Sequence, residues 1–276
     1  MAEHPDKPIH SFMSVALKRS QTLIYVDDSP MCIHNTVNPK ENSTPIVFLH
    51  GWGISPRSYQ SVCNEIAQNG HNVFAPAIPG FGGSEPLHDP QHDTYNRTVQ
   101  HILATIQASD LPSPIPFVGH SYGAGIAVSI AHQHPELISH LILICPIGGS
   151  GPSVLKWLTL ISGIRYELPQ HPIERMFDVI PSLTKNPVAF AANGIAAKHT
   201  NLHTILTQVV SSGIPVTLVA ADQDKIVPIG ELSRIPYATH VKVHGTHGWL
   251  LHEPKEAADL VEAAITYKLY DDETWT

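Results

Sequence analysis

Short apolar runs alternate along the chain with segments whose apolar residues recur at helical spacing. Apolar runs bounded by glycine or proline are typical of buried strands, and they occur at residues 45–51, 72–80, 115–121, 137–146, 214–222 and 240–245. Helical spacing is found between them, at residues 57–70, 94–109, 122–135 and 253–269. This alternation predicts an α/β protein with a mostly parallel, doubly wound sheet of the eight-stranded type and helices on both faces.

The first two apolar segments depart from this alternation because no helix separates them. Residues 22–28 and 31–37 indicate an antiparallel pair of strands joined around the turn residues Asp28, Ser29 and Pro30. Aspartate, serine and proline are common in turns because of their local hydrogen bonds and fixed backbone angles. We therefore expect a hairpin before the parallel part of the sheet begins.

A second departure lies between Pro146 and Ile214, where the pattern changes to several short apolar helices separated by proline and glycine. An insertion over one end of the sheet explains this change. We therefore expect three regions: a flexible arm at residues 1–15, a core at residues 16–147 and 212–270, and a helical cap at residues 148–211.

Composition limits what the chain can bind. Of its 276 residues, 42% are hydrophobic and 14% are charged, which is enough apolar material for a full core. The formal net charge is −8 and lysine and arginine form no cluster, so nucleic acid and anionic membrane surfaces are poor partners. No stretch predicts a membrane span or a secretory signal. Three widely spaced cysteines predict no disulfide framework, which favours a cytoplasmic location.

The residues GHSYG at positions 119–123 fit the pattern G-x-S-x-G. They follow a predicted strand and open a predicted helix, which is the setting of a nucleophile elbow. The turn is so sharp that a side chain at position 119 or 123 would collide with neighbouring backbone. An ordinary turn serine is the alternative, but this setting favours Ser121 as a nucleophile at the start of a helix.

A serine hydroxyl needs a base within hydrogen-bond reach, and that base needs an acid to orient it. Asp222 and Asp224 lie at and just after the end of one late strand, and His244 and His247 lie at and just after the end of the last strand. His247 is favoured as the base because it has the loop position before the final helix, whereas His244 is better explained as the end of the strand. Both aspartates would also suit a turn.

Several motifs in one order resemble the α/β-hydrolase superfamily. Besides the elbow, they are HGWG at 50–53, PAIPGFGGS at 76–84, VAADQDKIVP at 219–228 and GTHGWLLHEP at 245–254. The resemblance extends over about residues 20–266. One position departs from it, because Ala77 stands where many members have aspartate, which affects the anchoring of that loop more than catalysis.

The resemblance also implies roles for individual residues. Asp224 is favoured as the acid because it stands three residues before a Val-Pro pair, as in the family pattern. The backbone N–H of Tyr122, which follows the nucleophile, is expected to face the oxyanion. The resemblance implies that the backbone N–H of Trp52 is the second donor. A nucleophilic serine argues against the superfamily members that use a carboxylate at this position.

We therefore expect a serine hydrolase that cleaves a carboxylic ester or thioester of modest size through an acyl-enzyme. Apolar residues of the expected cap, Trp157 and Phe177 among them, would suit an apolar substrate group, or would only bury the cap against the core. A hydrolase of carbon–carbon bonds in diketone-like compounds would use the same triad. A non-catalytic or slow ligand-binding receptor on the same fold is a further alternative.

Neither a metal nor a cofactor is expected. The 19 histidines form no H-E-x-x-H arrangement, and neither a phosphate-binding loop nor a dinucleotide fingerprint occurs. The expected partner is a small-molecule substrate, and the sequence indicates no particular oligomeric state.

Overall fold

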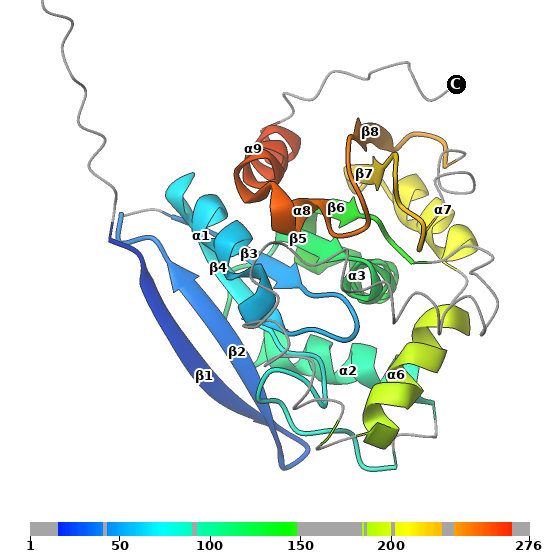
Figure 1. Cartoon of the computed structure of the whole chain (residues 1–276). Coiled ribbons are helices and arrows are strands. Elements are labelled where there is room, and N and C mark those ends of the chain that lie inside the picture. Colours follow the sequence, from blue (N-terminus) through cyan, green and yellow to red (C-terminus); the bar gives the residue numbers. More distant parts are fainter. Residues whose placement is uncertain are drawn as a thin grey trace, which may run out of the picture.

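The computed structural model describes residues 16–40, 43–89, 93–147, 184, 187–199, 202–227 and 235–266. Within them one sheet has the strand order β1-β2-β4-β3-β5-β6-β7-β8 (Figure 1). The strands are β1 (Lys18–Val26), β2 (Ser29–Val37), β3 (Thr44–Leu49), β4 (His71–Pro76), β5 (Ile115–His120), β6 (Ile138–Ile144), β7 (Val216–Ala221) and β8 (Thr239–Val243). β1 pairs antiparallel with β2, and β2 with β4, whereas all later pairs are parallel. The predicted mostly parallel sheet is confirmed.

Helices cover both faces of this sheet, as predicted. The α-helices are α1 (Gln60–Gln68), α2 (Thr94–Gln107), α3 (Tyr122–Gln133), α6 (Pro187–His199), α7 (His203–Ser211), α8 (Trp249–His252) and α9 (Pro254–Ile265), and two 3₁₀ helices are η1 (Pro56–Tyr59) and η2 (Pro135–Leu137). One apolar cluster joins the sheet to α2, α3 and α7, and a second joins it to α1, α8 and α9. None of the helices in the described part of the chain is long and apolar enough to cross a membrane.

The hairpin of β1 and β2 is present, but its turn lies earlier than predicted. Val26 pairs with Ser29, so the turn consists of Asp27 and Asp28, and Ser29 and Pro30 already belong to β2. The two aspartates have φ of 48° and 62°. A two-residue hairpin turn that follows the twist of its strands needs such positive φ values, which aspartate tolerates and proline cannot adopt.

The strand predicted at residues 72–80 is also shorter than expected. β4 ends at Pro76, and a turn follows in which the N–H of Phe81 donates to the carbonyl of Ile78 at 2.9 Å. Gly80 lies within this turn at a φ of 88°. The apolar run therefore continues into a buried loop, which periodicity does not distinguish from a strand.

The parallel strands bring several loops to one edge of the sheet. Each of β3, β5, β6, β7 and β8 runs in the same direction, so their carboxyl ends lie side by side. The register gives the neighbours at this edge: Leu49 with Gly119, His120 with Ile144, Ile144 with Val219, and Ala221 with Val243. Ligand sites of open α/β sheets lie beyond the carboxyl ends of the strands, so this edge is where a site is expected.

Helix α6 packs against this core from within the segment expected to be a cap. Asn193 of α6 is buried, and its Oδ1 accepts from the Tyr122 hydroxyl at 3.1 Å and from the Thr98 hydroxyl at 3.4 Å. Its Nδ2 donates to the carbonyl of Ala189 at 2.9 Å. The boundaries of the cap stay a prediction, since much of residues 148–211 lies outside the described residues.

We expect Asn193→Ala to lower the free energy of unfolding by about 1–3 kcal/mol, because it removes a partner from the buried Tyr122 hydroxyl. Adding Tyr122→Phe should recover part of the loss, since the hydroxyl that lost Asn193 as its partner then disappears. Denaturant unfolding of both single variants and the double variant measures this coupling. Strictly additive losses would show that the hydrogen bond between α6 and α3 does not contribute.

Candidate active site

Ser121 occupies a sharp turn between β5 and α3, with φ of 52° and ψ of −114°. A Cβ on Gly119 would lie 2.5 Å from the Cα of Ala124, and one on Gly123 would overlap the backbone oxygen of Leu49. The steric reason predicted for both glycines is confirmed. Non-glycine residues with such a backbone are strained, and they persist where the surroundings fix them.

Hydrogen bonds from neighbouring elements hold the backbone of Ser121 in this conformation. Its N–H donates to the carbonyl of Ile144 at the end of β6 at 3.0 Å, and its own carbonyl accepts from Ala124 at 3.1 Å. The residue is 8% exposed. The elbow is therefore tied to the neighbouring strand on one side and to the first turn of α3 on the other.

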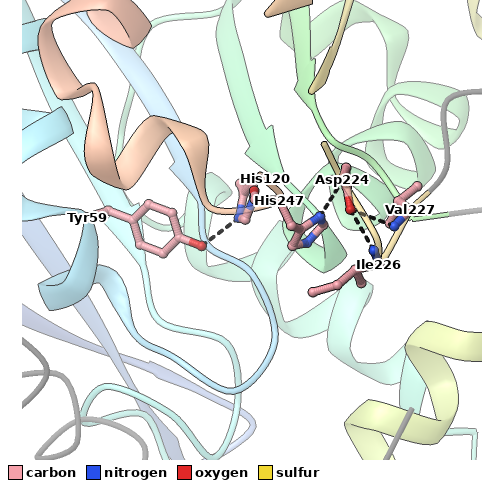
Figure 2. A network of polar contacts seen from close by, with 6 residues as sticks. All are labelled: Tyr59, His120, Asp224, Ile226, Val227 and His247. Atoms are coloured by element: carbon pink, nitrogen blue, oxygen red, sulfur yellow. Dashed lines mark hydrogen bonds and ion pairs between the residues drawn. The ribbon is translucent and has the colours of Figure 1, made fainter. Parts of the chain in front are cut away.

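Asp224 and His247 form a short buried pair beside this elbow (Figure 2). Nδ1 of His247 donates to Oδ2 of Asp224 at 2.7 Å, and the side chains are 10% and 1% exposed. Oδ1 of Asp224 accepts from the N–H groups of Ile226 at 2.7 Å and Val227 at 2.8 Å. The pair fixes the tautomer of His247 with its proton on Nδ1, which leaves Nε2 as the acceptor.

The Asp224 carboxyl stays ionised in this buried place. Burial by itself raises its pKa, but the charge of His247 and the hydrogen bonds from His247, Val227 and Ile226 outweigh burial and hold the pKa below its ordinary value. A buried carboxylate that accepts several hydrogen bonds behaves in this way. Asp224 can therefore stabilise a positive charge on His247.

The competing residues Asp222 and His244 pair with each other instead. Nδ1 of His244 donates to Oδ2 of Asp222 at 2.9 Å, and the His244 side chain is 81% exposed. Hydrogen bonds from His244 and the N–H of Gly245 lower the pKa of Asp222. Asp224 and His247 thus form a buried pair, and Asp222 and His244 form a surface pair. The buried pair is the one favoured from the sequence.

His120 links the loop of His247 to the elbow. It directly precedes Ser121, its Nε2 donates to the backbone carbonyl of His247 at 2.9 Å, and the two rings lie 4.9 Å apart between centroids. Burial, and then the charge of His247, lower the pKa of His120 to about 3. His120 is therefore neutral, and it places His247 beside the turn that carries Ser121.

The two expected oxyanion donors lie at the same edge. Tyr122 is the first residue of α3, and Trp52 lies in the loop after β3. The indole N–H of Trp52 donates to the carbonyl of Phe190 in α6 at 2.9 Å, and the two rings lie 4.5 Å apart between centroids. The N–H of Gly51 donates to the hydroxyl of Tyr59 at 2.9 Å, so it is not the donor that this loop would supply.

Trp157 and Phe177, the predicted substrate contacts, lie outside the described residues.

Cys145 directly follows β6 and lies beside Asp224 and His247. Its sulfur, a carboxylate oxygen of Asp224 and a ring nitrogen of His247 all lie within 4.8 Å of one another. Thiolate, imidazole and carboxylate are the ligand types of Zn²⁺. The short hydrogen bond between Asp224 and His247 already engages two of these three groups.

Sequence reasoning missed His120 and Tyr59. His120 fills a variable position of the G-x-S-x-G pattern, so the motif gave no reason to single it out. Tyr59 lies within a predicted helix at apolar spacing, which explained it as a core residue. No signal in the sequence indicates that these two side chains meet.

Comparison with known proteins agrees with this fold. A family model described as the α/β hydrolase fold matches residues 44–173. A putative non-heme haloperoxidase of Mycobacterium phage D29 is 25% identical over 245 residues, which is 80% of this chain and 87% of that protein. A pimeloyl-[acyl-carrier protein] methyl ester esterase of Aromatoleum aromaticum is 22% identical over 257 residues, 81% of this chain and 99% of that protein.

A solved structure supports the same classification. The enol-lactonase of Burkholderia xenovorans LB400 superposes with a TM-score of 0.76 at 14% identity, over 89% of this chain and all of that one. Sheet order, elbow and family match together define a protein of the α/β-hydrolase fold. The family model over residues 44–173 and the likeness to this structure both assign the α/β-hydrolase fold to the chain.

The buried neutral state of His120 predicts a pH dependence of stability. The ordinary pKa is 6.5 and the folded pKa is about 3, so between these values the unfolded chain binds a proton that the folded chain does not. Stability therefore falls as pH falls below about 6.5, by about 1.4 kcal/mol per pH unit from this group.

His120→Gln removes this contribution. The difference in unfolding free energy between the wild type and His120→Gln should shrink as pH falls from 6.5 to 4.5, which denaturant unfolding at each pH measures. A difference that stays constant over this range would contradict a neutral buried His120.

Proposed function

We propose that the chain is a serine hydrolase that cleaves a carboxylic ester or thioester of modest size, with Ser121 as nucleophile, His247 as base and Asp224 as acid. The observation that carries this proposal is the buried, short hydrogen bond between Asp224 and His247 on a loop bonded to the residue before Ser121. Such a pair beside a strained serine is the arrangement that activates a weak nucleophile.

The proposed reaction has two halves. Nε2 of His247 accepts the proton of Ser121 while the oxygen attacks the substrate carbonyl, and Asp224 stabilises the resulting imidazolium. The oxyanion accepts hydrogen bonds from the N–H groups of Tyr122 and Trp52. Its collapse breaks the bond to the alcohol or thiol, which leaves with the proton from His247. Water, deprotonated by His247, then attacks the acyl-enzyme, and His247 returns this proton to the oxygen of Ser121 as the acid is released.

The choice of an ester draws on the relatives. The A. aromaticum relative is an esterase and the B. xenovorans neighbour is a lactonase, so both names state ester chemistry. The phage relative is named for a different reaction, haloperoxidation. A panel of esters, thioesters, diketones and a peroxide–halide assay distinguishes these possibilities.

We expect a fluorophosphonate probe to label the wild type and not Ser121→Ala, because only an activated serine attacks the probe. Mass spectrometry of the labelled peptide locates the adduct. An ester series of increasing acyl length should then show turnover. An unlabelled but folded wild type would favour the ligand-binding receptor, and cleavage of diketones alone would favour the carbon–carbon hydrolase.

The acid is tested by a matched pair of substitutions. Asp224→Asn should lower kcat by about 10⁴-fold, because the amide no longer holds His247 in the useful tautomer. Asp222→Asn changes the neighbouring surface pair in the same way and should leave kcat within about twofold. Equal losses in the two variants would remove Asp224 from the proposed triad.

A further inference from the structure

A continuous set of hydrogen bonds joins three loops at the carboxyl edge of the sheet, and part of it is drawn in Figure 2. The N–H of Gly51 donates to the oxygen of Tyr59 at 2.9 Å, and that oxygen lies 2.7 Å from Nδ1 of His120. Nε2 of His120 lies 2.9 Å from the backbone oxygen of His247. The network therefore links the Trp52 loop, the elbow of Ser121 and the loop of the proposed base.

Only one placement of the protons satisfies this network. The backbone oxygen of His247 can only accept, so Nε2 of His120 carries a proton. Because burial keeps His120 neutral, its Nδ1 is bare and accepts from the Tyr59 hydroxyl. The Tyr59 oxygen in turn accepts from Gly51, whose N–H can only donate. The direction of every bond follows from the two backbone groups at the ends.

The network is buried and closely packed. Tyr59 is fully buried and His120 is 3% exposed. A Cβ on Gly51 would lie 3.0 Å from the Tyr59 oxygen and 3.1 Å from Nδ1 of His120, so the backbone of this loop rests directly on the hydrogen bond between the two side chains. Hydrogen bonds in such low-dielectric surroundings are strong, and breaking one leaves a costly unpaired group.

We propose that His120 is a positioning residue that holds the backbone of His247 beside Ser121, and that Tyr59 holds the Gly51–Trp52 loop through the same network. The proposal rests on the proposed function, since it assigns His247 as the base. His120 acts through a carbonyl and Tyr59 acts through an N–H, and neither is required to touch the substrate. A displacement of about 1 Å in a catalytic group lowers rates by about 100-fold, so small shifts of these loops matter.

A neutral donor is the only suitable group at position 120. The proposed reaction makes His247 an imidazolium, and the His120 ring lies 4.9 Å from it. A second positive charge there would oppose proton transfer from Ser121 to His247. The position therefore needs an uncharged side chain that donates toward the carbonyl of His247.

Two isosteric substitutions separate positioning from mere filling of space. Gln places an N–H near the position of Nε2 and keeps the bond to His247, whereas Asn reaches only the position of Nδ1 and loses that bond. We expect His120→Asn to lower kcat and the rate of fluorophosphonate labelling by about 10- to 100-fold with KM changed less than about threefold. His120→Gln should recover most of both rates.

Tyr59→Phe tests the other end of the network, because it removes only the hydroxyl oxygen. It keeps the ring, whose centroid lies 5.1 Å from that of Phe48. It should lower kcat about tenfold or more, since Gly51 loses its partner.

The pair His240→Asn and His240→Gln is a matched control. His240 also donates from Nε2 to a backbone carbonyl, that of Ile235, at 2.9 Å, but it lies near the amino end of β8. Neither His240 variant should change kcat beyond about twofold.

The outcomes distinguish this proposal from the proposed function. Equal labelling rates for folded His120→Asn and His120→Gln would overturn positioning of His247, and a Tyr59→Phe variant with wild-type kcat would overturn the role of Tyr59. Thermal unfolding of each variant identifies any that fails to fold. A wild type that is not labelled at all would instead overturn the proposed function.

Discussion

The buried carboxylate of Asp224 is the group on which the arrangement of the site depends. An unpaired carboxylate inside a protein costs several kcal/mol, and here two N–H groups and one imidazole offset that cost. Those partners come from the turn after β7 and from the loop after β8. The carboxylate therefore fixes both loops, because moving either loop away would leave the buried charge without some of its hydrogen-bond donors.

Parallel strands explain why so few residues are needed to hold these loops together. Each loop starts from a strand end that is hydrogen-bonded to its neighbour, so the loops begin at fixed spacing. The elbow is tied to β6 through Ile144, and His120 connects it to the loop of His247. Side-chain bonds then set the final positions of groups that the sheet has already brought close.

Much of this could be predicted from the sequence because the responsible forces are local. Interior parallel strands are buried on both faces and read as apolar runs, and the glycines of the elbow follow from sterics at one turn. The choice between Asp222 and Asp224 drew on a family pattern, since both would suit a turn. The Tyr59–His120 contact could not be predicted, because it joins two segments that lie 61 residues apart in the sequence. Aspartate, serine and proline all suit turns, so composition does not fix the position of the hairpin turn, and only the strand register identifies Asp27 and Asp28 as its centre.

The indole of Trp52 gives helix α6 a direct mechanical link to the proposed oxyanion loop. Its N–H is bonded to the carbonyl of Phe190, and the two rings are in contact. Any shift of α6 must either break this bond or move the indole with it. The position of α6 and the position of the proposed oxyanion loop are therefore coupled through one hydrogen bond and one ring contact.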